Sequence, residues 1–231
     1  MTVLLVLFTL IAFLTADYFV QRTRAARERE AAQETVPGMT EIPADAAIAN
    51  NHTWIKNVGA GAFVIGIDEF LGRMIGAAER ILLPREGAAV GPWLPAITVS
   101  ARTNRLNLGA PLAGRVVSVN YAVLENPALA RKDPYGSGWL LRVEADARQP
   151  LLPKSLKGGA AASWLKEQLD LAKQFFAGLP HAGAVGVSQD GGSLVEGVLR
   201  NYDEMIWKEF ERRFATLSEP SVQATTEHSK K

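Results

Sequence analysis

Short apolar runs separated by turn residues fill the chain between Thr53 and Ala145. Many short strands at such spacing are typical of a small barrel or sandwich. In the last run, Trp139, Leu141 and Val143 fall on one face, which is the two-residue period of a strand. The runs that we expect to form strands are 53–58, 62–67, 80–84, 88–100, 110–120 and 138–145.

Two breaks between these runs have helical character. Residues 68–74 begin with Asp68, a residue type that caps helix amino termini. Residues 121–130 contain Pro127, which suits a first turn or a kink. The pattern therefore predicts an α+β fold.

Charge and composition exclude several function classes. The 24 acidic and 25 basic residues nearly cancel, so no overall field attracts nucleic acid. Cysteine is absent, which rules out disulfides, thiolate metal sites and cysteine nucleophiles. The three histidines, His52, His181 and His228, are far apart in the sequence. We therefore expect no enzyme activity, no metal and no nucleic-acid partner.

The amino terminus has the character of a membrane anchor. Residues 2–20 are almost wholly apolar, and a helix of this length spans roughly 28 Å, close to the hydrocarbon thickness of a bilayer. A cleaved secretory signal is the alternative, but signals carry basic residues before the apolar run. Here Arg22, Arg24, Arg27 and Arg29 follow it. We predict one transmembrane helix at residues 1–22, with the body on the cytoplasmic side.

The segments outside the strand-rich region are predicted to be a tether, a helical extension and a tail. Residues 23–51 form the tether, because Pro37, Gly38 and Pro43 interrupt any helix there. Residues 151–217 form the helical extension. Residues 218–231 are polar and are expected to be disordered.

The extension is predicted to be a helical hairpin. Apolar residues recur at steps of three and four from Trp164 to Leu179, which predicts a first helix. Ser193 and Glu196 match a capping box that would start a second helix, which would run to Leu217. The two helices would pack on each other and on the strands. Alternatively, part of their aromatic surface would dock another subunit.

The strand-rich region resembles the H protein of the glycine cleavage system. The resemblance covers residues 52–150 and implies a lipoyl-like flattened β-barrel (a barrel-sandwich hybrid) of two small sheets with short helices around it. The segments that carry it are His52-Thr-Trp54, Ile65-Gly-Ile-Asp-Glu-Phe70, Pro111-Leu-Ala-Gly-Arg-Val-Val-Ser-Val-Asn120, Leu124-Glu-Asn-Pro-Ala-Leu129 and Asp133-Pro-Tyr-Gly-Ser-Gly-Trp139.

One residue that this family requires is missing. In H proteins the lipoyl group is attached to a hairpin lysine eight residues before a Pro-x-x-Gly bend, and counting back from Pro111 gives Thr103. Residues 57–131 contain no lysine at all. Arginine cannot substitute, because lipoylation needs a nucleophilic amine and the guanidinium pKa lies above about 12. We therefore predict that no lipoyl cofactor is bound at Thr103.

The residues around Thr103 have two interpretations. Arg102, Asn104 and Arg105 could contact a carboxylate, a phosphate or an acidic partner surface. Alternatively, they form a solvated turn in which Asn104 adopts the left-handed backbone conformation.

These features together predict a non-catalytic scaffold or accessory subunit. It would be anchored in the lipid bilayer and would hold a protein partner or part of a membrane complex. The alternative is a lipoyl or acyl carrier that uses an unconventional lysine, Lys56 or Lys132. A third hypothesis is a small-molecule sensor that uses the space left by the absent arm.

Overall fold

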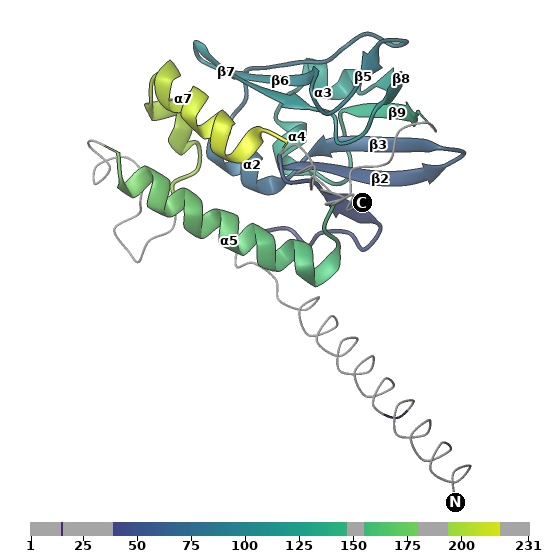
Figure 1. The fold of residues 1–231 in the computed structure, drawn as a ribbon. Coiled ribbons are helices and arrows are strands. Elements are labelled where there is room, and N and C mark those ends of the chain that lie inside the picture. Colours follow the sequence, from purple (N-terminus) through teal and green to yellow (C-terminus); the bar gives the residue numbers. More distant parts are fainter. Residues whose placement is uncertain (1–14, 16–38, 147–154, 180–193, 218–231) are drawn as a thin grey trace, which may run out of the picture.

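The computed structural model describes residue 15 and residues 39–146, 155–179 and 194–217 (Figure 1). The predicted membrane span apart from Thr15, most of the tether and the predicted tail lie outside these ranges. Among the described residues, no helix combines the length and apolarity needed to cross a bilayer.

Two antiparallel sheets form the centre of the fold, as the resemblance implies. The larger sheet has six strands in the order β1-β2-β3-β9-β8-β5, and the smaller has three in the order β4-β6-β7. The predicted flattened two-sheet barrel is thus confirmed. The strands of the larger sheet are β1 (Ala46–Ile48), β2 (Thr53–Gly59), β3 (Ala62–Ile67), β9 (Leu141–Ala145), β8 (Gly114–Val119) and β5 (Ala89–Val90). Those of the smaller sheet are β4 (Arg80–Leu82), β6 (Pro95–Ala101) and β7 (Asn104–Gly109).

Short helices connect and cover the sheets. The Asp68 carboxylate accepts a hydrogen bond from the Leu71 N–H at 3.0 Å, so the predicted cap at the start of α2 is present. The predicted helix at 121–130 is divided into α3 and α4, and Pro127 lies at the break. The helices of this region are α2 (Glu69–Ile75), α3 (Tyr121–Glu125) and α4 (Leu129–Lys132).

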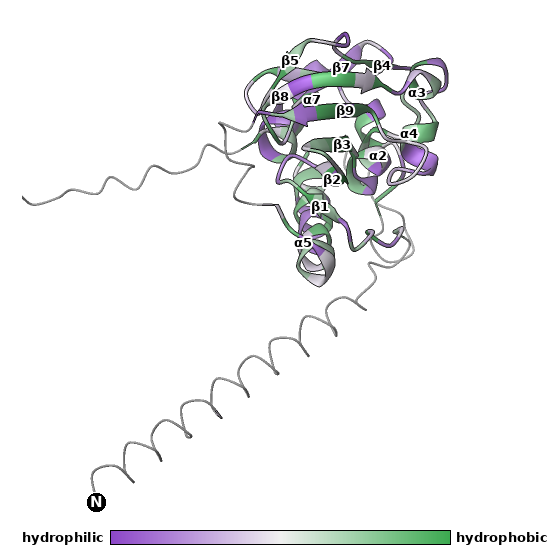
Figure 2. Cartoon of the chain, turned by 90° about the vertical axis from the view of Figure 1, so that its right-hand side faces the viewer, coloured by the Kyte–Doolittle hydropathy of each residue, from purple (hydrophilic) through white to green (hydrophobic). Residues whose placement is uncertain are grey.

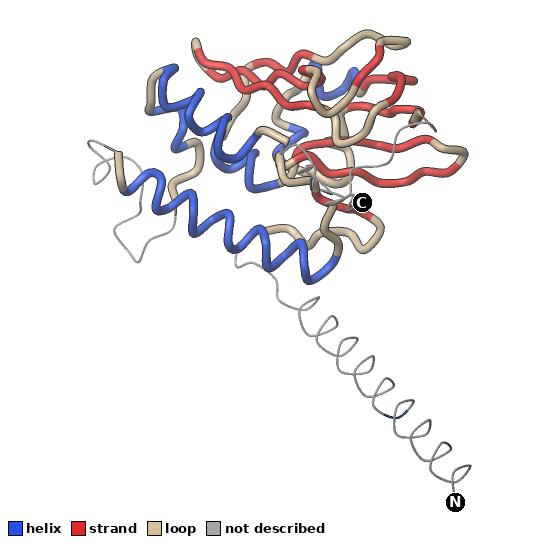
Figure 3. The backbone as a smooth tube through the Cα atoms, viewed as in Figure 1, coloured by secondary structure: helices blue, strands red, loops and turns tan. Residues whose placement is uncertain are grey.

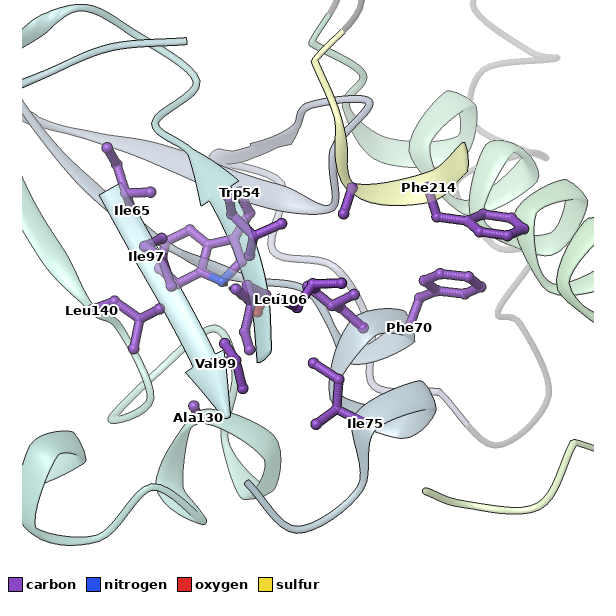
Figure 4. Close-up of a cluster of buried hydrophobic side chains, with 14 of the residues drawn as sticks. Trp54, Ile65, Phe70, Ile75, Ile97, Val99, Leu106, Ala130, Leu140 and Phe214 are labelled. Atoms are coloured by element: carbon purple, nitrogen blue, oxygen red, sulfur yellow. Dashed lines mark hydrogen bonds between the residues drawn. The ribbon is translucent and has the colours of Figure 1, made fainter. Parts of the chain in front are cut away.

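The core lies between the two sheets and around Trp54 (Figure 4). The Trp54 indole N–H donates to the Ile67 carbonyl at 3.1 Å. A Cβ at Gly66 would lie 2.6 Å from the indole ring, so only glycine fits beside it. Apolar and hydrophilic segments alternate along the strands in Figure 2, as expected for strands with one buried face.

The folded unit begins earlier than the predicted boundary at residue 52. Strand β1 pairs with β2, with Ile48 opposite Trp54. The Ile48 N–H donates to the Leu156 carbonyl, and the Leu156 N–H donates to the Ile48 carbonyl, each at 2.8 Å. The residues from Ala46 to Ala49 are buried, so this end of the predicted tether belongs to the sheet. Leu156 belongs to the predicted extension, so its hydrogen bonds to Ile48 join the start of the extension to strand β1.

The first predicted helix of the extension is present as α5 (Gly158–Ala177), with Leu165, Phe175 and Phe176 buried. The second was predicted wrongly. Ser193 lies outside the described residues, and from Leu194 on the chain is not one continuous helix. The chain instead forms a 3₁₀ turn η1 (Val198–Asn201), the helix α7 (Glu204–Phe210) and a π-helical turn η2 (Glu211–Ala215). Figure 3 shows α5 and this broken segment on the same side of the molecule.

A close contact between the backbones of Gly76 and Gly197 explains why one continuous helix does not form here. Gly197 has φ +73° and lies against Gly76, where an added Cβ would be 2.7 Å from the Gly197 Cα. The Gly197 N–H donates to the Arg73 carbonyl at 2.7 Å. Glu196 forms an ion pair with Arg131. The helix then starts at Asp203, whose carboxylate accepts from the Ile206 N–H at 3.1 Å.

Aromatic side chains join α5 to the broken segment. Phe210 lies 6.1 Å from Phe175 and 6.2 Å from Phe176, and Phe214 lies 5.9 Å from Phe175, measured between ring centroids. Phe70 of α2 completes the cluster. The predicted packing of the two carboxyl-terminal segments on each other is confirmed, and these rings are covered within the chain itself.

Candidate functional site

The β6–β7 hairpin carries the turn that the sequence singles out. Ala101 pairs with Asn104, which leaves Arg102 and Thr103 as a two-residue turn. Thr103 is exposed at this turn, as is Arg102. The whole hairpin from Pro95 to Gly109 contains no lysine. An amine is therefore missing from the projecting end of this hairpin.

Asn104 does not adopt the left-handed backbone conformation predicted for it. The left-handed backbone conformation belongs to Arg102, with φ +55°. Asn104 is the first residue of β7 and only 8% exposed. Its side-chain amide donates to the Tyr202 carbonyl at 3.0 Å. The strand register causes this difference, because it places Asn104 opposite Ala101 and turns its side chain toward η1.

A row of side chains crosses the outer face of the smaller sheet just below the turn. Arg80 of β4 pairs with Ser100 of β6, and Ser100 pairs with Arg105 of β7. Directly opposite residues of antiparallel strands have their side chains on the same face. The neighbouring row, Ile81, Val99 and Leu106, is buried on the other face. The two arginines therefore point outward, with the serine between them.

A cleft of about 420 Å³ lies over this row. Glu79 at its edge pairs with Arg200, with 3.2 Å between the guanidinium nitrogen and the carboxylate oxygen. Within the described ranges, Arg80, Arg102 and Arg105 form no ion pair. We call this feature the arginine cleft; its lining residues are Glu79, Arg80, Leu82, Ser100, Arg102, Thr103, Asn104 and Arg105.

The carboxyl-terminal segment covers the edge of β7. The Asn107 N–H donates to the Glu211 carboxylate at 3.0 Å. Together with the Asn104–Tyr202 bond, this contact occupies the side of the hairpin that faces α7 (Figure 1). An exposed strand edge is a template for pairing with another chain. The Asn107 N–H already has an acceptor in Glu211. Arg102 and Thr103, at the turn itself, remain exposed.

The two lysines considered as alternative carrier sites are not on the hairpin. Lys56 lies in β2, and its ammonium group is 2.6 Å from the Asp45 carboxylate. The hydrogen bond from Lys56 lowers the pKa of Asp45 below its ordinary value. Lys132 is the exposed last residue of α4.

A buried histidine–aspartate pair lies away from the hairpin. His52 Nδ1 is 2.7 Å from an Asp68 oxygen, and both side chains are fully buried. The His52 ring stacks between Phe70 and Trp164, at centroid distances of 4.0 and 4.8 Å. No local sequence pattern indicates that Asp68 is the partner of His52, because the two residues are 16 positions apart. No serine or threonine hydroxyl is hydrogen-bonded to this histidine in the described chain, so the pair has the character of a core contact.

Comparisons with known proteins agree with this architecture. The family model for the glycine cleavage H-protein matches residues 46–167. The H protein of Pseudoalteromonas atlantica is 34% identical over 108 residues, which cover 47% of this chain and 84% of that protein. The H protein of Carboxydothermus hydrogenoformans is 36% identical over 106 residues, which cover 46% of this chain and 81% of that protein.

Among solved structures, an H protein from Mycobacterium marinum is similar, with 28% sequence identity and a TM-score of 0.47. The match covers 55% of this chain and 98% of that one. The family model spans more than half of the 231 residues. It includes both sheets and the first half of α5. This chain therefore belongs to the glycine cleavage H-protein family.

Proposed function

We propose that this protein is a non-enzymatic scaffold or accessory subunit that uses the H-protein fold without a lipoyl arm. The observation that carries the proposal is the hairpin turn, where Thr103 and Arg102 stand and no amine is present. An amide-linked lipoyl group needs a nucleophilic amine, which neither a threonine hydroxyl nor a guanidinium provides. Without the arm, the protein can act only by binding other molecules on its surface.

The packing of the hairpin supports the same proposal. A carrier arm must move between active sites, so the surface around its attachment point has to stay accessible. Here Glu211 and Tyr202 of the carboxyl-terminal segment bond to β7 beside the turn. This side of the hairpin is thereby built into the fold. The turn itself stays exposed, so it is available to a partner surface while the side of the hairpin that faces α7 is held in place.

The membrane part of the proposal rests on the sequence. The apolar run at 2–20 has the length of a membrane span, and four arginines follow it. We propose that it anchors the chain in the bilayer with the H-protein domain on the cytoplasmic side. The partner would then be a cytoplasmic protein or a subunit of a membrane complex.

Affinity purification of the full chain in mild detergent tests the scaffold role. The expected result is a second protein that co-purifies in a fixed stoichiometric ratio through size-exclusion chromatography. A chain that elutes only as a lone monomer would contradict the proposal. A variant lacking residues 1–22 shows whether the partner is held by the anchor or by the folded domain.

Intact-mass spectrometry of the same sample tests the absence of a carrier arm. The mass should equal that of the 25.0 kDa chain without addition, apart from processing of the initiator methionine. An H protein with its lipoyl lysine, expressed in the same cells, serves as the positive control. A gain equal to a lipoyl group, located by peptide mapping on Lys56 or Lys132, would favour the carrier alternative.

A further inference from the structure

The arginine cleft contains more positive charge than the described part of the chain neutralises. Glu79 is paired with Arg200, and the nearby Glu204 is paired with Lys208 at 2.8 Å. Glu204 also interacts electrostatically with Arg105. The three arginines of the cleft, Arg80, Arg102 and Arg105, still outnumber these two carboxylates, each of which already has another cationic partner. Charges within about 10 Å of one another still interact at moderate salt. A bound anion would relieve this repulsion.

The strand register determines how these cations are arranged. Arg80 and Arg105 lie in one cross-strand row, two strand positions apart, so their Cα atoms are separated by about 10 Å. Ser100 lies between them, is half-buried and lines the cleft. Arg102 reaches the same cleft from the turn. Arginine and serine donors thus line the same cleft.

These donors match one chemical class of ligand. A guanidinium group presents parallel N–H donors that bind phosphate or carboxylate oxygens in pairs. The volume of about 420 Å³ fits a small molecule and falls within the usual range for such sites. We propose that the arginine cleft binds a small, multiply charged organic oxyanion, such as a phosphate monoester or a short dicarboxylate.

The proposal goes beyond the scaffold role and does not depend on it, since every lining residue belongs to this chain. An acidic surface of a protein partner is the competing occupant. The structure favours a small molecule because Ser100 and the arginines line a concave space. Asn104, which also lines it, is held in place by its hydrogen bond to the Tyr202 carbonyl.

Isothermal titration calorimetry of the full chain in mild detergent tests this inference. The probes are inorganic phosphate and, in a second arm, succinate, each compared with chloride at equal ionic strength. We expect saturable binding of at least one probe. The probe that binds more tightly identifies the ligand class. Binding of neither probe at concentrations up to about 10 mM, the range of a weak site, would overturn the proposal.

Substitutions locate the binding. Arg80→Gln and Arg105→Gln should each raise the Kd of the bound probe at least about tenfold, because each removes a charge-assisted contact. Arg105→Lys keeps the charge without the paired donors and should fall between Arg105→Gln and the unaltered chain. Arg142→Gln is the matched control, because Arg142 is an exposed arginine on β9 of the other sheet. All three residues replaced are at exposed positions, so the melting temperature in chloride should not change.

Two outcomes would decide against the site. Equal loss of binding in the Arg142→Gln control, or no loss in Arg80→Gln and Arg105→Gln, would show that the anion binds elsewhere. If the arginine variants lose a co-purifying protein while neither probe binds the unaltered chain, the cleft is a protein contact and the small-molecule proposal is wrong. A chain that binds phosphate without any partner leaves the scaffold proposal to its own test.

Discussion

At the scale of single residues, Asp68 connects two parts of the core. One of its oxygens caps α2 through the Leu71 N–H at 3.0 Å, and the other lies 2.7 Å from His52 Nδ1. His52 in turn stacks on Trp164 of α5. One carboxylate thus holds the start of α2 and orients the ring that α5 packs on.

We predict that Asp68→Ala destabilises the protein by about 2–4 kcal/mol. The loss of a helix cap costs about 1 kcal/mol, and a buried imidazole without its partner adds about 1–3 kcal/mol. Urea denaturation of the full chain, followed by tryptophan fluorescence, measures the change. Asp68→Asn is the matched control, because its amide can still cap Leu71 and bond to His52. A loss below about 0.5 kcal/mol in Asp68→Ala would contradict the assigned role.

The sequence predicts such residues only in part. Asp68 is recognisable as a cap because its signal is local: a capping residue type stands at the start of a short apolar segment. Its bond to His52 joins residues 16 positions apart, and no local pattern encodes it. The Arg80–Ser100–Arg105 row is hidden for the same reason, because it depends on the register of strands that are distant in the chain.

At the scale of elements, the segment η1–α7–η2 closes the open edge of the smaller sheet. Strand β7 pairs only with β6 in that sheet. The Glu211 carboxylate accepts from the Asn107 N–H, as a neighbouring strand would. The contact also holds the base of the hairpin that carries the arginine cleft.

We expect Glu211→Ala to expose this edge. Hydrogen exchange of the Asn107 amide should become faster by about tenfold, because a charge-assisted bond is worth roughly 1.5–3 kcal/mol and solvent screening reduces this at a half-buried site. Exchange measured residue by residue with NMR or by mass spectrometry of peptides covering 104–109 gives the readout. Glu211→Gln, which keeps an acceptor oxygen, should behave nearly as the unaltered chain.

A second control separates this contact from general effects on α7. Glu209 lies two residues before Glu211, and its carboxylate bonds to Arg212 and Arg213, which holds its pKa down at about 2. These pairs lie at the surface, so Glu209→Ala should leave the exchange of Asn107 unchanged. Faster exchange in Glu209→Ala to the same extent would show that fraying of α7, and not the Glu211 bond, is being measured.

Local pattern predicts some of these elements and fails for others. The three-and-four spacing of apolar residues predicts α5 because that helix buries one continuous face. The Ser193–Glu196 signature fails because Glu196 pairs with Arg131 and Gly197 crosses α2 at Gly76. Strand β7 has no continuous apolar run and is therefore absent from the predicted strands, although Leu106 and Leu108 show the two-residue period of a half-buried strand.

At the scale of the whole molecule, the anchor that we propose at the amino terminus would hold the H-protein domain near one side of the membrane. Strand β1 begins at Ala46, so about 25 residues separate the predicted span from the first strand. Even a compact linker of this length lets the domain lie close to the bilayer surface. The arginines after the span would stay on the same side as the domain.

The absence of cysteine makes this orientation directly testable. Two variants, Thr2→Cys and Met205→Cys, would each contain a single thiol. Met205 is 74% exposed. In intact cells a membrane-impermeant maleimide should label Thr2→Cys but not Met205→Cys if the domain lies in the cytoplasm, as we propose from the positive-inside bias. After permeabilisation both variants should react, which controls for accessibility. Labelling of Met205→Cys in intact cells would reverse the orientation, and full release of the chain by alkaline carbonate would contradict the anchor itself.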